Sequence, residues 1–191
     1  MKEAIQASLK SSIALKNNIL NDEKLLLSIE RAVDIIVKTY QQKGKVLLCG
    51  NGGSAADAQH IAAELSGRFC FDRPPLYAEA LHVNTSYITA VANDYSFDNV
   101  FSRMIVAAGQ QSDVLIAIST SGNSKNIVQA VKQAKQQGML VIGFTGNDGG
   151  LMRTMCDCLL NVPSQEIPRI QEIHITIGHI ICELVEKQLF A

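Results

Sequence analysis

Two residues that can do acid–base or metal chemistry stand one helical turn apart, at His60 and Glu64. Their spacing of four residues places both side chains on one face of a helix. An imidazole and a carboxylate in this arrangement can exchange protons with a substrate or bind one metal ion. The turn-like sequence Asn51-Gly52-Gly53-Ser54 lies just before them. Because a helix that begins there has free N–H groups, the same segment can also bind an anion.

The glycines of this turn also fit the looser dinucleotide pattern Gly50-x-Gly52-x-x-Ala55. That function requires an acidic residue about twenty positions later, at the end of a second strand. Asp72 has this spacing, but the sequence Phe71 to Pro75 around it is typical of a loop. The Gly-Lys-Ser/Thr sequence of a P-loop is also missing. The sequence therefore disfavours a nucleotide cofactor at this turn.

A second turn, Ser119 to Ser124, carries four hydroxyl side chains in six residues and lies between an apolar strand and a helix. Hydroxyls and helix N–H groups can bind a phosphate monoester without a P-loop lysine. The alternative is an ordinary serine-rich turn in which Ser124 caps the helix. The presence of the similar turn Asn51 to Ser54 after another strand favours the phosphate interpretation.

Polar residues also interrupt the apolar helix near the C-terminus, where Gln171, Glu172, His174 and His179 occur. A single histidine on a helix is usually structural. Burying several polar groups on one helix requires partners for each of them. Metal binding or catalysis is one reason for such a group.

Apolar strands that alternate with amphipathic helices predict how these residues are positioned. Helices are expected at 2–20, 22–40, 54–66, 86–93, 98–108, 124–137 and from Pro168 to Leu189, and strands at 45–49, 80–83, 113–118, 139–144 and 158–162. Such alternation predicts an α/β fold with about five parallel strands and helices on both faces. We expect one domain, 1–191, in which 1–42 is an N-terminal helical segment available to pack on a neighbouring subunit.

Composition excludes several other classes of protein. The net charge is −1 and no long basic run occurs, so a nucleic-acid surface is not expected. The five cysteines are odd in number, which favours reduced thiols in the cytoplasm, and Cys156-x-Cys158 is better explained by packing than by metal or redox chemistry. We see no secretion signal and no apolar run long enough to span a membrane.

Taken together, these motifs resemble bacterial phosphoheptose isomerases of the sugar-isomerase (SIS) fold. The resemblance rests on Cys49 to Ser54, Asp57-x-x-His60-x-x-x-Glu64, Ala92-Asn93-Asp94, Ile118 to Ser124 and Arg169 to His174. It implies a three-layer αβα domain and a cytoplasmic homotetramer with active sites at subunit interfaces. It also implies conversion of D-sedoheptulose 7-phosphate to D-glycero-D-manno-heptose 7-phosphate, an early step toward the heptose of lipopolysaccharide or capsule.

The resemblance also implies roles for individual residues. The acid–base residues would be Glu64 and His179, and one Zn²⁺ per active site would be bound by His60, Glu64, Gln171 and His179. The residues that contact the phosphorylated seven-carbon sugar would be Asn51, Gly52, Gly53, Ser54, Glu64, Arg68, Asn93, Asp94, Ser119, Thr120, Ser121, Ser124 and Gln171. The sequence departs from the family at Ile167-Pro168 and matches it loosely over 70–79, and Arg68 is the only site residue assigned near that segment.

A different class of protein shares this fold, namely a tetrameric, non-catalytic protein that binds the replication initiator. The presence of His60, Glu64, Gln171 and His179 together favours the enzyme. A sugar-phosphate-sensing regulator would need an additional helix-turn-helix, which we do not see.

Helix geometry raises a question about the implied metal ligands. Gln171 and His179 lie eight positions apart on one helix, about 12 Å along its axis and roughly 80° around it. Zinc ligands must lie about 2.0–2.2 Å from the ion. We therefore expect Gln171 and His179 to reach one ion from different subunits.

Overall fold

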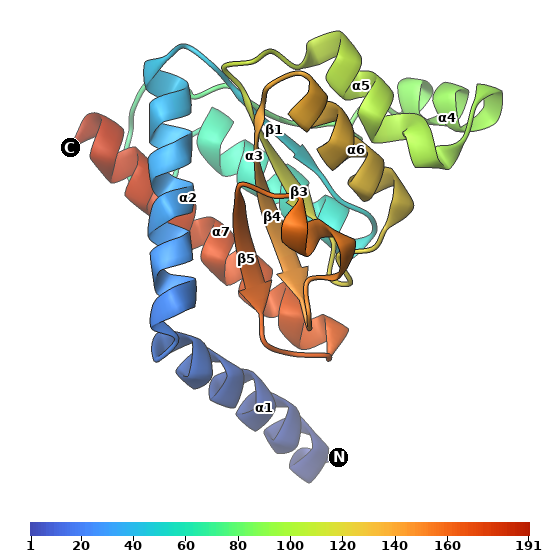
Figure 1. The fold of residues 1–191 in the computed structure, drawn as a ribbon. Coiled ribbons are helices and arrows are strands. Elements are labelled where there is room, and N and C mark those ends of the chain that lie inside the picture. Colours follow the sequence, from blue (N-terminus) through green and yellow to red (C-terminus); the bar gives the residue numbers. More distant parts are fainter.

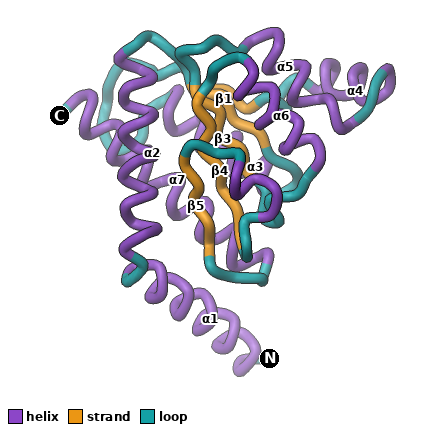
Figure 2. The backbone as a smooth tube through the Cα atoms, viewed as in Figure 1, coloured by secondary structure: helices purple, strands orange, loops and turns teal.

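The computed structural model describes residues 1–191 and contains one five-stranded parallel sheet with the order β2-β1-β3-β4-β5 (Figures 1 and 2). Along the chain the elements are α1 (Lys2–Leu20), α2 (Glu23–Gln41), β1 (Val46–Cys49), α3 (Gly53–Ser66), β2 (Ala78–Ala80), α4 (Thr85–Asp94), η1 (Phe97–Asn99), α5 (Val100–Ala108), β3 (Val114–Ile118), α6 (Lys125–Gln136), β4 (Leu140–Gly146), η2 (Gly150–Thr154), β5 (Cys158–Val162) and α7 (Ile167–Phe190). The predicted α/β class and the five parallel strands are confirmed.

Helices cover both faces of the sheet. Successive side chains of a strand point to opposite sides, and in the buried strands the side chains on both sides are apolar and need cover. Val46 and Leu48 of β1 belong to a core shared with α2, α3 and α7. Leu47 and Cys49 of the same strand belong to a second core, shared with α4, α5 and α6. The result is the three-layer αβα arrangement that the sequence predicted.

The N-terminal helical segment consists of α1 and α2, which differ in how they pack. α2 lies along the sheet, and the side chain of its capping residue Asp22 accepts a hydrogen bond from the Leu25 N–H. α1 extends away from the domain in Figure 1 and leaves Ile5, Leu9 and Ile13 more than half exposed. This apolar stripe is consistent with the expected packing on a neighbouring subunit, which stays a prediction.

The largest difference from the predicted elements is at the edge of the sheet. β2 occupies Ala78–Ala80, whereas the sequence predicted a strand at 80–83. Only three residues pair with β1, and two of them are incompletely buried, so the apolar pattern of this edge strand is weak. None of the helices has the length and apolar character that a membrane crossing requires.

Candidate functional site

The two polar turns lie next to each other at the carboxyl edge of the sheet. β1 and β3 are neighbours, and the chain proceeds from them in opposite directions across the sheet. Parallel sheets bind ligands at such a switch point. Asn51 follows β1 and Asn126 lies in the first turn of the helix after β3. Each side-chain amide donates a hydrogen bond of 2.9 Å to the other, which joins the two turns.

The hydroxyl groups of the second turn are arranged around this switch point. Ser119 is buried, and its Oγ donates to the Oγ of Ser124 over 3.1 Å. Ser124 is the N-cap residue of α6 but makes no side-chain capping bond, so the interpretation as an ordinary capped turn is wrong on this point. Ser121 and Thr120 are more accessible. The turn therefore presents hydroxyls that the helix cap does not use.

Three side chains that can bind a metal meet farther along α3. His60, Glu64 and His179 each offer a ligand atom, and these atoms lie within 4.8 Å of one another. His60 Nε2 is 3.0 Å from Glu64 Oε1, and the ring centroids of His60 and His179 are 4.9 Å apart. The Nε2 atom of His179 is buried and has no hydrogen-bond partner. We call these three residues the triad.

A glycine allows the helices that carry the triad to approach closely. Gly178 of α7 faces Ile61 of α3, and a Cβ atom at Gly178 would lie 2.6 Å from the Ile61 Cδ1 atom. Any side chain at residue 178 would therefore require the Ile61 side chain to move or the two helices to separate. Gly178 immediately precedes His179, so its lack of a side chain helps to bring His179 to His60.

The triad fits the metal that the family resemblance implies. Two imidazoles and a carboxylate are ligand types that zinc accepts, and three protein ligands leave a position free for substrate or water. An ion bound here would also satisfy the unpartnered His179 Nε2 atom. The observation supports a metal centre at the triad.

The other predicted site residues are not all in one place. Gln171 lies against the start of α3, where its Nε2 atom would be 2.4 Å from a Cβ atom at Gly53. Gly53 is seven residues before His60, about 10 Å along the helix, so Gln171 lies beside the first turn and away from the triad. Arg68 is exposed in the loop after α3.

Asn93 and Asp94 belong to α4, which covers the opposite face of the sheet from α7. They are exposed at the end of α4, where the Asn93 amide donates to the Asp94 carboxylate over 2.9 Å. Figure 1 shows α4 at the opposite side of the domain from α7. A single chain therefore does not bring these two residues to the triad.

Sequence reasoning missed several residues that support the site. Asn126 joins the turns, and Phe69 packs on His179 with ring centroids 5.6 Å apart. Asp57, one turn before His60, has a buried Oδ2 atom without a partner. Burial raises the pKa of the Asp57 carboxyl, and the charge of His60 opposes this rise. The sequence signal was the motif Asp57-x-x-His60-x-x-x-Glu64, which contains Asp57 but was not used to assign it a role.

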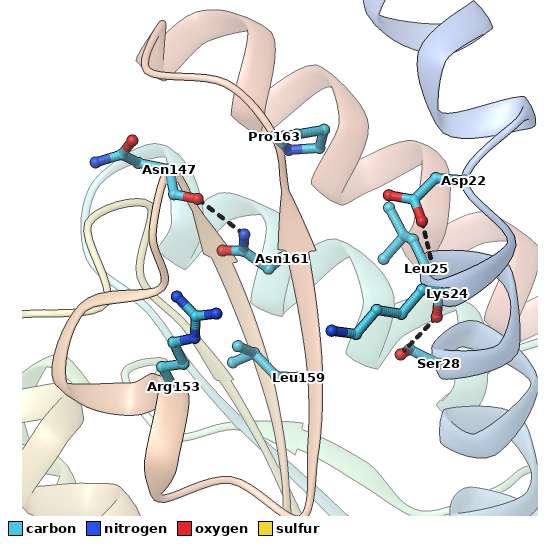
Figure 3. Close-up of a pocket in the computed structure, with 9 residues that line it drawn as sticks. All are labelled: Asp22, Lys24, Leu25, Ser28, Asn147, Arg153, Leu159, Asn161 and Pro163. Atoms are coloured by element: carbon cyan, nitrogen blue, oxygen red, sulfur yellow. Dashed lines mark hydrogen bonds between the residues drawn. The ribbon is translucent and has the colours of Figure 1, made fainter.

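A separate polar cavity of about 500 Å³ opens beside the start of α2 and contains none of the predicted site residues. In Figure 3 the side chains of Lys24 and Arg153 approach it from opposite walls. The lining residues are Asp22, Lys24, Leu25, Ser28, Asn147, Arg153, Leu159, Asn161 and Pro163. The cavity is therefore distinct from the triad and from both turns.

Comparison with known proteins agrees with this geometry. Residues 10–146 match the family model described as "SIS domain". The chain is 54% identical over its whole length to phosphoheptose isomerase from Clostridium acetobutylicum, and the match covers 97% of that protein. It is 51% identical over its whole length to phosphoheptose isomerase from Aneurinibacillus thermoaerophilus, and the match covers 96% of that protein.

Solved structures give the same result. The phosphoheptose isomerase from Neisseria gonorrhoeae superimposes with a TM-score of 0.92 and 43% identity, covering 97% of this chain and 98% of the other. The isomerase from Francisella tularensis has a TM-score of 0.93 and 39% identity, with 97% of each chain covered.

The doubly wound sheet, the paired turns and the family model define a SIS-domain protein. The sequence identity with full-length relatives is high enough to assign the chain to a particular enzyme family within this class. The chain belongs to the phosphoheptose isomerase family and is an isomerase. This result decides against the non-catalytic protein of the same fold.

Proposed function

We propose that the protein is an aldose–ketose isomerase that converts D-sedoheptulose 7-phosphate to D-glycero-D-manno-heptose 7-phosphate, for heptose biosynthesis. The observation that carries the proposal is that His60 and Glu64 lie on the same helix that begins at the Asn51–Ser54 turn, with His179 of α7 beside them. Such an arrangement offers an anion site and an acid–base site on one element. The names of the relatives support the substrate class.

The phosphate of the sugar is the group that the paired turns suit best. Ser119, Thr120, Ser121 and Ser124 offer hydroxyls, and the turn Asn51–Ser54 offers the N–H groups at the start of α3. Hydroxyls and helix N–H groups both donate to phosphate oxygens. Gln171 lies beside Gly53 and is available to donate to the sugar or its phosphate. This assignment fixes one end of the substrate about two helical turns from the triad.

The reaction moves a proton between two adjacent carbons after the sugar ring opens. It needs a base at the carbon-bound hydrogen and an acid at the oxygen that gains a proton. In our proposal Glu64 is the base, and His179 is the acid and also stabilises the charge that develops on the substrate oxygen. Glu64 is partly buried and close to His60, which holds the carboxylate in a defined orientation.

A metal ion bound at the triad is compatible with the roles proposed for Glu64 and His179. We propose that one Zn²⁺ per site is held by His60, Glu64 and His179, with Gln171 as a further ligand. When bound, such an ion supplies a positive charge that polarises substrate oxygens. A carboxylate bound to a cation is a weaker base, so Glu64 would act as the base only when it is not a ligand of the ion.

We further propose a homotetramer whose active sites are completed by neighbouring subunits. Within one chain Gln171 lies beside Gly53, and Asn93 and Asp94 lie across the domain from α7. Subunit assembly is the means by which these residues can reach a triad. The exposed apolar stripe of α1 supplies surface for such an interface.

The test is an assay of the purified protein on sedoheptulose 7-phosphate, with and without a chelator. We expect turnover, loss of activity after chelation and recovery on addition of zinc. Fructose 6-phosphate, a ketose phosphate one carbon shorter, is the control substrate. Absence of turnover by a folded, zinc-loaded tetramer would overturn the substrate assignment.

A further inference from the structure

A buried ion pair lies beside the triad, and the reaction proposed above gives it no role. Arg73 Nε donates to Glu186 Oε1 over 2.9 Å, and their side chains are 1% and 0% exposed. Taking two charges out of water costs free energy that their mutual attraction does not always recover. The presence of this pair is therefore explained better by the other hydrogen bonds that the two side chains make.

Glu186 holds the loop that follows α3. Its two carboxylate oxygens accept hydrogen bonds from the Phe69 N–H at 3.0 Å and from the Cys70 N–H at 2.7 Å. Burial alone would raise the pKa of Glu186, but these bonds and the Arg73 charge lower it overall. The carboxylate thus stays ionised and connects α7 to the loop.

Arg73 holds the end of α3. Its guanidinium donates to the carbonyl oxygens of Glu64 at 2.9 Å, Leu65 at 2.8 Å and Gly67 at 3.2 Å. The last carbonyls of a helix have no partner within the helix. A positive charge also interacts favourably with the negative end of the helix dipole. Arg73 therefore caps the helix that carries His60 and Glu64.

The loop held by Glu186 contacts the triad through the aromatic ring of Phe69. The Phe69 ring lies 5.6 Å from the His179 ring, with 31° between the two planes. His60 contacts the same His179 ring in an edge-on arrangement. His179 and Glu186 are seven residues apart on α7, so they lie on one face of that helix. The ion pair and the triad thus join the same two helices at successive levels.

We propose that Arg73 and Glu186 are positioning residues for the reaction. They fix α3 against α7 and hold Phe69 over His179, so that the His179 ring faces His60 and Glu64. The inference rests on the roles proposed for the triad. Errors of about 1 Å in the position of reacting groups cost up to about 100-fold in rate. The pair is therefore expected to affect kcat more than substrate binding.

The test compares Phe69→Leu, Glu186→Gln and Arg73→Lys with the control Glu183→Gln. Glu183 lies on the same helix, is partly exposed and pairs with Lys187, so its substitution removes a charge from α7 and leaves the bonds of Glu186 to the loop in place. We expect kcat to fall between about 10- and 100-fold in the first three variants, with KM within about threefold of wild type. The control should retain both values.

A second measurement separates positioning from stability and does not depend on the sugar. NMR spectra of the histidine ring nitrogens, recorded on metal-free protein, should show altered His179 signals in the three variants and unaltered signals in the control. The buried His174 serves as an internal standard for intact packing. Zinc affinity, measured by chelator competition, should fall about tenfold in the same variants.

The outcomes are distinct. Folded variants with lower Tm but wild-type kcat, His179 signals and zinc affinity would overturn the proposal and leave the pair a purely structural one. If Glu186→Gln fails to fold, Phe69→Leu carries the test, because it leaves the ion pair in place. If the wild type does not turn over sedoheptulose 7-phosphate, the substrate proposal fails, while the NMR and zinc measurements still decide this one.

Discussion

Asn51 and Asn126, which are 75 residues apart, exchange two side-chain hydrogen bonds of 2.9 Å. Asn126 Oδ1 also accepts from the Ile127 N–H, so the amide is fixed to the start of α6. The pair joins the turn after β1 to the turn after β3. A ligand that contacts both turns therefore meets a site whose width is set before it binds.

Alanine at either residue should leave the other amide without its partner. We expect Asn51→Ala and Asn126→Ala each to lower the free energy of unfolding by about 1–3 kcal/mol. The double variant should cost less than the sum of the two, and urea unfolding of all four proteins measures this coupling. Gln129→Ala, on the exposed face of α6, is the control. Strict additivity would show that the two bonds do not act as a unit.

Removing the hydroxyls of Ser119 and Ser121 should weaken binding of the phosphorylated sugar specifically. The double variant Ser119→Ala, Ser121→Ala loses two groups that can donate to phosphate oxygens, each worth about 1–3 kcal/mol toward a charged partner. Calorimetric titration with sedoheptulose 7-phosphate and with sedoheptulose measures the effect. An equal loss for both ligands would place the phosphate elsewhere.

Glu64→Gln should abolish most of the activity and preserve the fold. The amide has nearly the same shape as the carboxylate but cannot accept the proton, and loss of such a group commonly costs about 10²–10⁴ in rate. Steady-state kinetics and circular dichroism are the measurements. Glu172→Gln is the matched control on the neighbouring helix, where the side chain bonds Ser12 and Arg169 instead of the triad. Full activity of Glu64→Gln would exclude Glu64 as the base.

Mixed oligomers test whether Gln171 and His179 act from different subunits. Gln171→Ala and His179→Ala proteins should each be inactive alone. After dissociation and reassembly together, some sites would contain wild-type residues from both chains, and partial activity should return. Oligomers reassembled from one variant are the control. If mass spectrometry shows mixed tetramers and no activity returns, the two residues act within one chain.

His174 should make the protein less stable in mild acid. Burial lowers the pKa of this histidine to about 4, while its Nε2 atom bonds the Thr145 carbonyl oxygen. A folded-state pKa below the unfolded value of about 6.5 means that the stabilising neutral form is fully present above pH 6.5. This contribution is lost as the pH falls from about 6.5 to 4, by about 2 kcal/mol at pH 5.

His174→Gln keeps a donor for Thr145 but cannot gain a proton in this range. The variant should therefore lose less stability than wild type between pH 7 and pH 5, and urea unfolding at both pH values measures the difference. Identical losses would show that other groups control the acid response.

Much of the fold could be predicted from local patterns. The buried strands β1, β3 and β4 are continuous apolar runs that end at polar turns, and the predicted helices agree with the observed ones within a few residues. β2 could not be placed well, because an edge strand of three residues leaves little apolar pattern. Of the four metal ligands that the family resemblance implied, the structure brings His60, Glu64 and His179 together within one chain, whereas Gln171 lies beside Gly53.

The supporting residues could not be found in this way. Asn126 looks like any polar residue at the start of a helix, and its function appears only when Asn51 is opposite. Glu186 lies on the apolar C-terminal helix with no nearby partner in sequence, since Arg73 is 113 residues away. Such contacts depend on how α3 and α7 pack, which no local pattern contains. The separation of Gln171 and His179, by contrast, followed from helix geometry alone.

α7 follows the other elements of the domain along the chain, and this order affects how the site arises during synthesis. Both turns and α3 leave the ribosome well before His179 and Glu186, which belong to the last 24-residue helix. A nascent chain thus contains all five strands and both turns while it still lacks a member of the triad and the carboxylate that holds the loop. The site stays incomplete until α7 has been synthesised and has packed against α3, and a chain that stops before residue 179 lacks a member of the triad.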